Sequence, residues 1–286
     1  MTVSFAPATG RSFRIVLEPR PAPANGPATT AHGISELRLI GEPRVTRFED
    51  KAGWSSEAGL EAMPTLPVEA GMALAPQDIV DLTGLMRPDG TLDWRAPEGR
   101  WTVLRFGWSL TGRQNHPASP EGTGLEVDKL SRKHVRAYAD AYLGEYEATV
   151  GRAMMGARGL GLMLTDSYEA GIANWTEDMP VQFARLRGYD LRPWLPALAG
   201  RVVGSAQESD AFLWDFRQTI GALMASEHYD ELSRALHERG MKRYGESHEG
   251  GRQMLVDGMS AKRSADIPMG AMWTTINRSG STRPEN

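Results

Sequence analysis

The sequence contains no cysteine among its 286 residues, which excludes disulfides, thiol nucleophiles and thiolate metal sites. Any bound metal would therefore depend on oxygen or histidine ligands. The chain also has no large excess of charge of one sign, because it contains 32 Lys and Arg residues and 36 Asp and Glu residues, which give a net charge of -4. No global field favours nucleic acid or an anionic membrane, so a neutral, polar ligand suits this composition better.

Long apolar runs are absent as well. No segment approaches the roughly 18 consecutive apolar residues that indicate a membrane helix. The first residues also lack the basic stretch followed by an apolar one that marks an export signal. We therefore expect neither a membrane anchor nor an export signal in the sequence as written. With 41% hydrophobic residues, the chain can form one large globular domain or two smaller ones.

The first hundred residues are rich in Pro and Gly and contain only short runs of alternating apolar and polar residues. Residues 12–19 and 34–48 alternate in this way, which predicts strands of an antiparallel sheet. A β-sandwich usually needs about seven strands, so we expect residues 1–60 to form only the end of one. Residues 61–99 are interpreted as a connector, with a turn at residues 88–90 (Pro-Asp-Gly).

From residue 100 onward, strand patterns alternate with helix patterns. Strands are expected at residues 101–110, 160–164, 241–244 and 265–273, and helices at 131–150, 183–200, 208–239 and 252–262. This alternation predicts an α/β fold with a parallel sheet and helices outside it. A (β/α)8 TIM-like barrel needs eight strands in about 250 residues, so we predict that residues 100–286 form the N-terminal part of a truncated barrel. A smaller open sheet, complete with four or five strands, is the alternative.

Two of the expected helices have an apolar face that follows the helical period. The residues assigned to these faces are Val135, Tyr138, Tyr142, Tyr146 and Val150 in the first helix, and Phe212, Phe216, Ile220, Leu223, Leu232 and Leu236 in the long one. Ser131 is expected to cap the N-terminus of the first helix.

Acidic and polar residues follow the expected strands at the point where each strand ends. Asp166, Tyr168 and Glu169 follow one strand and Glu246 follows the next. Because parallel strands present their carboxyl ends on one face, we expect these groups to converge. Two carboxyl groups flanking a sugar are the requirement for glycoside hydrolysis, and Glu169 is the candidate general acid. The alternative is that Glu169 simply opens a solvated loop.

Further residues are candidates for binding the substrate or a metal at the same edge. The candidate substrate-binding residues are Asp166, Tyr168, Asn115, Glu246, His248, Glu249 and Trp273. Asn115 lies in a polar loop at 111–131, which is either functional or a merely solvated surface loop. Aromatic rings near the strand ends either stack on sugars or close the core. Oxygen ligands such as Asp166 and Glu246 suit calcium better than zinc.

Five ordered segments resemble the central part of glycoside hydrolase family 106, the α-L-rhamnosidases. They are residues 97–131, LTDSYEAG (164–171), RGYDLRPWLPALAG (187–200), YGESHEGG (244–251) and ADIPMGAMW (265–273). Residues 34–54 resemble the end of the β-sandwich segment that precedes the barrel. The resemblance implies inverting hydrolysis of terminal α-L-rhamnosides, assisted by calcium, with Glu169 at the general-acid position.

The resemblance also implies what this chain lacks. Family members are several times longer, and their catalytic base lies on a later strand than any expected here, so Glu246 would contact sugar or calcium. The full-length family member would be periplasmic or secreted and would act on a carbohydrate containing α-L-rhamnose. Two alternatives remain: a retaining glycosidase that uses Glu169 and Glu246 as its carboxylate pair, and a carbohydrate-binding protein without catalysis.

Overall fold

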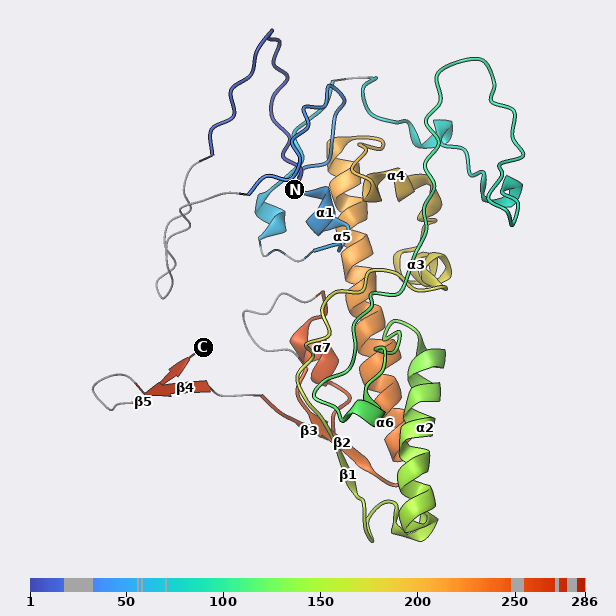
Figure 1. The fold of residues 1–286 in the computed structure, drawn as a ribbon, viewed down its shortest axis with the longest axis vertical. Helices are drawn as coiled ribbons and strands as arrows, with labels where there is room; N and C mark the ends of the chain where they lie inside the picture. The colour runs from blue at the N-terminus through green and yellow to red at the C-terminus, as the bar shows by residue number, and fades with distance from the viewer. Residues whose placement is uncertain are drawn as a thin grey trace.

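The longest element of the fold is a helix that runs through most of the molecule (Figure 1). It consists of α5 (Ala206–Leu223), a π-helical turn (Met224–Tyr229) and α6 (Asp230–His237) without interruption. Ser205 caps its start, because its hydroxyl accepts a hydrogen bond of 3.1 Å from the backbone N–H of Glu208. The apolar residues assigned to one face of this helix are all buried, which confirms the expected long helix.

The computed structural model describes residues 1–17, 33–55, 57, 59–69, 71–247, 255–270, 273–276 and 282–285. The other α-helices are α1 (Phe48–Lys51), α2 (Arg132–Val150), α3 (Met179–Arg187), α4 (Leu195–Leu198) and α7 (Gly258–Lys262). The strands are β1 (Leu162–Thr165), β2 (Lys242–Gly245), β3 (Ile267–Pro268), β4 (Trp273–Ile276) and β5 (Thr282–Glu285). Short 3-10 turns occupy Leu60–Ala62, Pro76–Asp78, Thr83–Leu85, Pro120–Gly122, Arg152–Met154 and Arg192–Trp194.

A small parallel sheet has the order β1-β2-β3, as the alternation of strands and helices predicted. Helices cover one of its faces, where Met163 packs against Leu143, Leu236 and Met241. On the opposite face, Leu162 and Leu164 are exposed by 51% and 46%. The chain is therefore an α/β protein whose parallel sheet is covered on one side in the described residues.

Helix α2 packs against α6 through Val135, as expected, but not through the rest of the expected face. Its buried residues are Val135, Ala139 and Leu143, whereas the three tyrosines and Val150 are exposed. The tyrosines instead contact one another along the surface, the first pair stacked with ring centroids 6.1 Å apart and the second pair edge-on at 5.2 Å. The small row of side chains lets α2 approach α6 closely, so the expectation for the tyrosine face is wrong.

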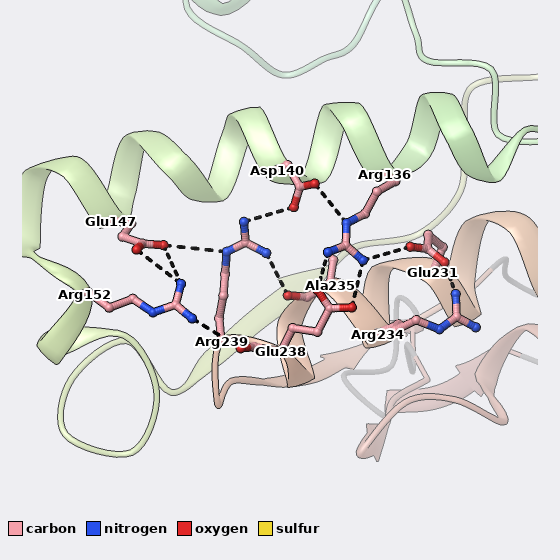
Figure 2. Close-up of polar contacts among 9 residues, drawn as sticks. All are labelled: Arg136, Asp140, Glu147, Arg152, Glu231, Arg234, Ala235, Glu238 and Arg239. Atoms are coloured by element: carbon pink, nitrogen blue, oxygen red, sulfur yellow. Dashed lines mark hydrogen bonds and ion pairs between the residues drawn. The ribbon is translucent and has the colours of Figure 1, made fainter.

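Ion pairs hold α2 against α6 around the apolar contact (Figure 2). Arg136 is central, because it pairs with Asp140 at 2.9 Å on its own helix and with Glu231 at 3.2 Å on α6. It also pairs with Glu238, and this hydrogen bond is the main reason that the pKa of Arg136 is raised. A second arginine, Arg239, which follows α6, pairs with Asp140 on α2 at 2.9 Å. The network fixes the helix layer on which the sheet rests.

Several expected strands do not form. The described parts of 12–19 and 34–48 contain no strand, and residues 44 and 201 share only an isolated bridge. Residues 101–110 also lack regular structure, and every one of them is exposed. An alternating sequence becomes a strand only where a neighbouring strand accepts its hydrogen bonds, and no such partner is present among the described residues. The strand expected at 265–273 is divided between β3 and the start of β4.

The N-terminal segments are attached to α5 by buried polar contacts. The ammonium of Lys51 lies 2.8 Å from the carboxylate of Asp210, which also accepts the backbone N–H of Thr65 at 2.7 Å. Farther along, Leu74 and Val203 form a parallel bridge. In the described parts of the chain, none of the helices is long and apolar enough to cross a bilayer.

Candidate active site

The tips of β1 and β2 lie side by side, as the sequence predicted. Thr165 pairs with Gly245 in the parallel register, and the backbone N–H of Glu246 donates to the carbonyl of Thr165 at 3.0 Å. One step farther on, the N–H of Tyr168 donates to the carbonyl of Ser247. Segments far apart in the sequence therefore meet at one edge, because parallel strands end on the same side.

Glu169 lies on the surface of this edge, with its side chain exposed. One carboxylate oxygen accepts a hydrogen bond of 2.9 Å from the hydroxyl of Ser167. Asp166, also exposed, accepts the backbone N–H of Ser167 at 2.7 Å, which turns the chain sharply after the strand. Ser167 thus lies between the two carboxylates and orients both of them. An exposed, oriented carboxyl group can reach a ligand and exchange a proton with it.

Tyr168 supports the edge from inside. Its ring is buried, its hydroxyl donates to the carbonyl of Gly171 at 2.9 Å, and the ammonium of Lys129 lies 5.5 Å from the ring centre. Burial is the main reason that the pKa of Tyr168 is raised. The ring therefore packs within the loop, which contradicts the expectation that it offers an open face to a sugar. Trp175 behaves in the same way, because it packs against Phe216 in the core.

The polar loop at 111–131 borders the edge at both of its ends. Near its start, the guanidinium of Arg113 lies against Gly171. Near its end, Asp128 accepts the hydroxyl of Thr176 at 2.7 Å. Asn115 holds the middle together, because its amide donates to the carbonyl of Gly122 at 2.9 Å and accepts the N–H of Gly124 at 2.7 Å. The described contacts of Asn115 thus shape the loop itself.

A buried polar cluster lies beneath the strand tips and was not anticipated from the sequence. Arg243 is fully buried in β2, where Ser233, Thr165 and Ser264 accept its hydrogen bonds at 2.8, 3.1 and 3.1 Å. The ring of Tyr229, from the π-helical turn, lies 5.4 Å from its guanidinium. The neighbouring His228 stacks edge-on against Tyr229. Such π-helical turns are frequent at functional sites, but a single sequence gives no periodicity signal for one.

Burial, and to a smaller extent the positive charges of Lys129 and Arg243, together lower the pKa of His228 to about 3. The unfolded imidazole takes up a proton near pH 6.5, whereas the folded one does so only near pH 3. The unfolded state therefore binds more protons over this window, and stability is lost as pH falls below about 6.5. We expect His228 to contribute a loss of about 2 kcal/mol of unfolding free energy between about pH 7 and about pH 5, measured by urea unfolding, with the slope approaching about 1.4 kcal/mol per pH unit at the acidic end.

The control for this pH dependence is a pair of histidine variants. His228→Gln should flatten the decline in unfolding free energy, whereas His116→Gln, at an exposed position, should leave the slope unchanged. If the unfolding free energy of His228→Gln fell with pH as steeply as that of the wild type, the prediction that folded His228 stays neutral would be wrong.

The remaining candidate residues are only partly covered by the structure. Glu246 is half-buried at the tip of β2, next to the β1 tip that carries Asp166. His248 and Glu249 lie outside the described residues, and Trp273 is described only by its backbone in β4. Across the described positions, no three acidic or histidine side chains gather as they would around a metal ion. Asp166 and Glu246 have the oxygen chemistry that calcium prefers, but two carboxylates supply only part of its six to eight ligands.

Comparison with known proteins places the chain in a well-defined group. Residues 12–286 match the sequence profile of glycoside hydrolase family 106, described as alpha-L-rhamnosidase. A protein of Formosa agariphila, provisionally named a beta-glucuronidase, is 39% identical over 254 residues, which are 87% of this chain and 21% of that protein. The structure of a rhamnosidase from Novosphingobium sp. PP1Y is similar with a TM-score of 0.77 at 43% identity, covering 91% of this chain and 24% of that one. The chain thus spans less than a quarter of the length of either relative.

Proposed function

Because this chain belongs to glycoside hydrolase family 106, we propose that it carries the general acid of an inverting α-L-rhamnosidase. The observation that supports this role is the exposed carboxyl group of Glu169 at the tip of β1, oriented by Ser167 and next to the tip of β2. In an inverting reaction, Glu169 protonates the glycosidic oxygen as the bond to the sugar breaks. A second carboxylate, about 6.5–9.5 Å away, activates the attacking water from the opposite face.

The proposed scaffold is part of a (β/α)8 barrel. In the described residues, helices cover one face of the parallel sheet and Leu162 and Leu164 are exposed on the other, which supports barrel strands whose inner face is the exposed one. We propose that the base lies on a later strand of the catalytic domain than those of this chain, as the family resemblance implies. We also propose that residues 1–60 form the end of a β-sandwich segment and that residues 61–99 connect it to the barrel.

The proposed substrate is a terminal α-L-rhamnoside of a polysaccharide or glycoside. We assign Asp166, Glu246, His248, Glu249 and Trp273 to sugar binding, and Asn115 and Tyr168 to shaping the site. Calcium would be held by Asp166 and Glu246 together with oxygen atoms from other sources, and its chemistry would be to bind vicinal sugar hydroxyls. The reaction steps above depend only on the protein's carboxyl groups.

The test uses the chain itself with two chromogenic substrates, p-nitrophenyl α-L-rhamnoside and p-nitrophenyl β-D-glucuronide. We expect ligand-observed NMR to detect binding of the rhamnoside, with little or no release of nitrophenol, because an acid without its base cannot complete the reaction. Rapid release that Glu169→Gln abolishes would contradict the placement of the base outside this chain. Binding of the glucuronide but not of the rhamnoside would contradict the proposed substrate.

A further inference from the structure

A groove of about 840 Å³ lies between the first half of α5 and residues 60–77. Its apolar lining includes Leu60, Val68, Ala73 and Ala206, and its exposed polar lining includes Glu61, Glu69, Gln77 and Gln207. No residue from the tips of β1 and β2 lines it. The groove is therefore separate from the candidate active site, and it combines an apolar floor with a polar rim.

Trp214 gives this groove a large, flat aromatic surface. The side chain lines the groove and remains 48% exposed, although a tryptophan of this size is usually covered when it belongs to a core. The guanidinium of Arg217 lies 5.7 Å from the ring centre and is anchored by a hydrogen bond of 2.8 Å to the carbonyl of Lys51. The ring is thus supported in place before any ligand arrives.

The charges around the groove are mixed and partly neutralised. The ammonium of Lys51 is paired with Asp210, whose carboxylate also accepts two hydrogen bonds from Thr65, at 2.7 and 2.8 Å. The cationic Arg217 then shares the groove with the carboxylates of Glu61 and Glu69. The carboxylates would repel an anionic ligand, and the guanidinium would repel a cationic one. A neutral ligand with hydroxyl groups suits both, because hydroxyls can donate hydrogen bonds to the carboxylates and accept them from the guanidinium.

Helix α1 connects the groove with the loop that follows β1. Arg217 bonds to the carbonyl of Lys51, at the end of α1, and the amide of Asn174 donates to the carbonyl of Ala52 at 3.0 Å. Figure 1 shows α1 beside the upper part of α5. The groove and the β1 loop are therefore fixed to the same short helix.

From these features we infer that the groove is a second carbohydrate-binding site, which takes a neutral pyranose stacked on Trp214. The apolar C–H face of the sugar covers the indole, while its hydroxyls bond to Arg217 and to the rim carboxylates. The choice of a carbohydrate as ligand rests on the proposed function. The site itself binds without cleaving, because it lies apart from Glu169.

The test is a fluorine NMR titration of the whole chain labelled with 5-fluorotryptophan. The chain has eight tryptophans, and the signal of Trp214 is assigned with the Trp214→Tyr variant. Methyl α-L-rhamnoside and methyl β-D-glucoside serve as neutral probes and glucuronate as the anionic one. We expect a saturable shift of the Trp214 signal with a neutral glycoside, the same curve in Glu169→Gln, and a weaker response to glucuronate. Trp54, which is exposed but does not line the groove, is the internal control and should not shift.

Three results would overturn the inference. The first is the absence of any Trp214 shift with neutral glycosides while ligand-observed NMR still detects rhamnoside binding, which would leave the proposed function intact. The second is a stronger response of Trp214 to glucuronate than to either neutral probe. The third is a Trp214 shift that depends on protein concentration without sugar, which would identify the groove as a contact between copies. The two proposals can also fail separately. If the Trp214 signal shifted saturably while the strand tips bound the glucuronide but not the rhamnoside, the groove would be supported as a sugar site and the proposed function would be contradicted.

Discussion

Replacing Glu169 by Gln should reduce kcat/KM for α-L-rhamnosides by about 10²- to 10⁴-fold, the usual contribution of general acid catalysis. The measurement needs a complete catalytic domain, so this chain would replace the equivalent segment of the Novosphingobium rhamnosidase. Gln keeps the size and polarity of the side chain but has no proton to give to the departing oxygen. The loss should shrink for substrates with a good leaving group, because these need less protonation.

The matched control for this experiment is Glu145→Gln in the same chimera. Glu145 is an exposed glutamate on α2, away from the strand tips, and its loss should leave kcat/KM unchanged. Equal activity of Glu169→Gln and the unsubstituted chimera, on substrates with poor leaving groups, would rule out Glu169 as the acid.

The second large effect is expected from Gly245→Ala at the end of β2. A Cβ at this position would overlap both the backbone oxygen and the hydroxyl of Thr165 on the neighbouring strand. The two strand tips would have to separate, which we expect to cost about 3 kcal/mol of unfolding free energy, the upper end of the usual penalty for overpacking. The same displacement would move Glu246 away from the tip of β1. Urea unfolding measures the free energy, and circular dichroism shows whether the helices persist.

A glycine elsewhere in the fold provides the opposite control. Gly144 lies within α2 and a Cβ there would meet no atom within 4 Å. Gly144→Ala should therefore stabilise the chain by about 0.5–1 kcal/mol, because alanine loses less conformational freedom than glycine on entering a helix. If Gly245→Ala changed stability as little as Gly144→Ala does, the close pairing of the strand tips would be wrong.

The sequence was sufficient to predict elements whose apolar pattern is unambiguous. The long helix from α5 to α6 has one apolar row, and β1 and β2 are short apolar or mixed runs between helices, so their order and parallel pairing were predictable. In α2, however, two rows with the helical period begin at Val135: one continues through the tyrosines, and the other through the smaller Ala139 and Leu143. Which row is buried depends on the shape of α6, and a single helix sequence does not contain that information.

The candidate site was predictable to the same extent. That Glu169 and Glu246 lie on adjacent strand tips follows from the parallel pairing of β1 and β2. The inward position of Tyr168, and the placement of the buried Arg243 beside Tyr229, depend on contacts between segments far apart in the sequence. Alternating residues at 101–110 misled the prediction, because strand formation requires a partner as well as a pattern.

The exposed, irregular stretch at 101–110 has a consequence for limited proteolysis. A protease can reach the backbone there, since all ten positions are exposed and carry no regular hydrogen bonding. A single cut would nevertheless leave the two fragments together, because Lys51 and Thr65 are bound to Asp210 and Leu74 bridges to Val203. The nicked protein would elute as one particle under native conditions and separate into two bands only on denaturation.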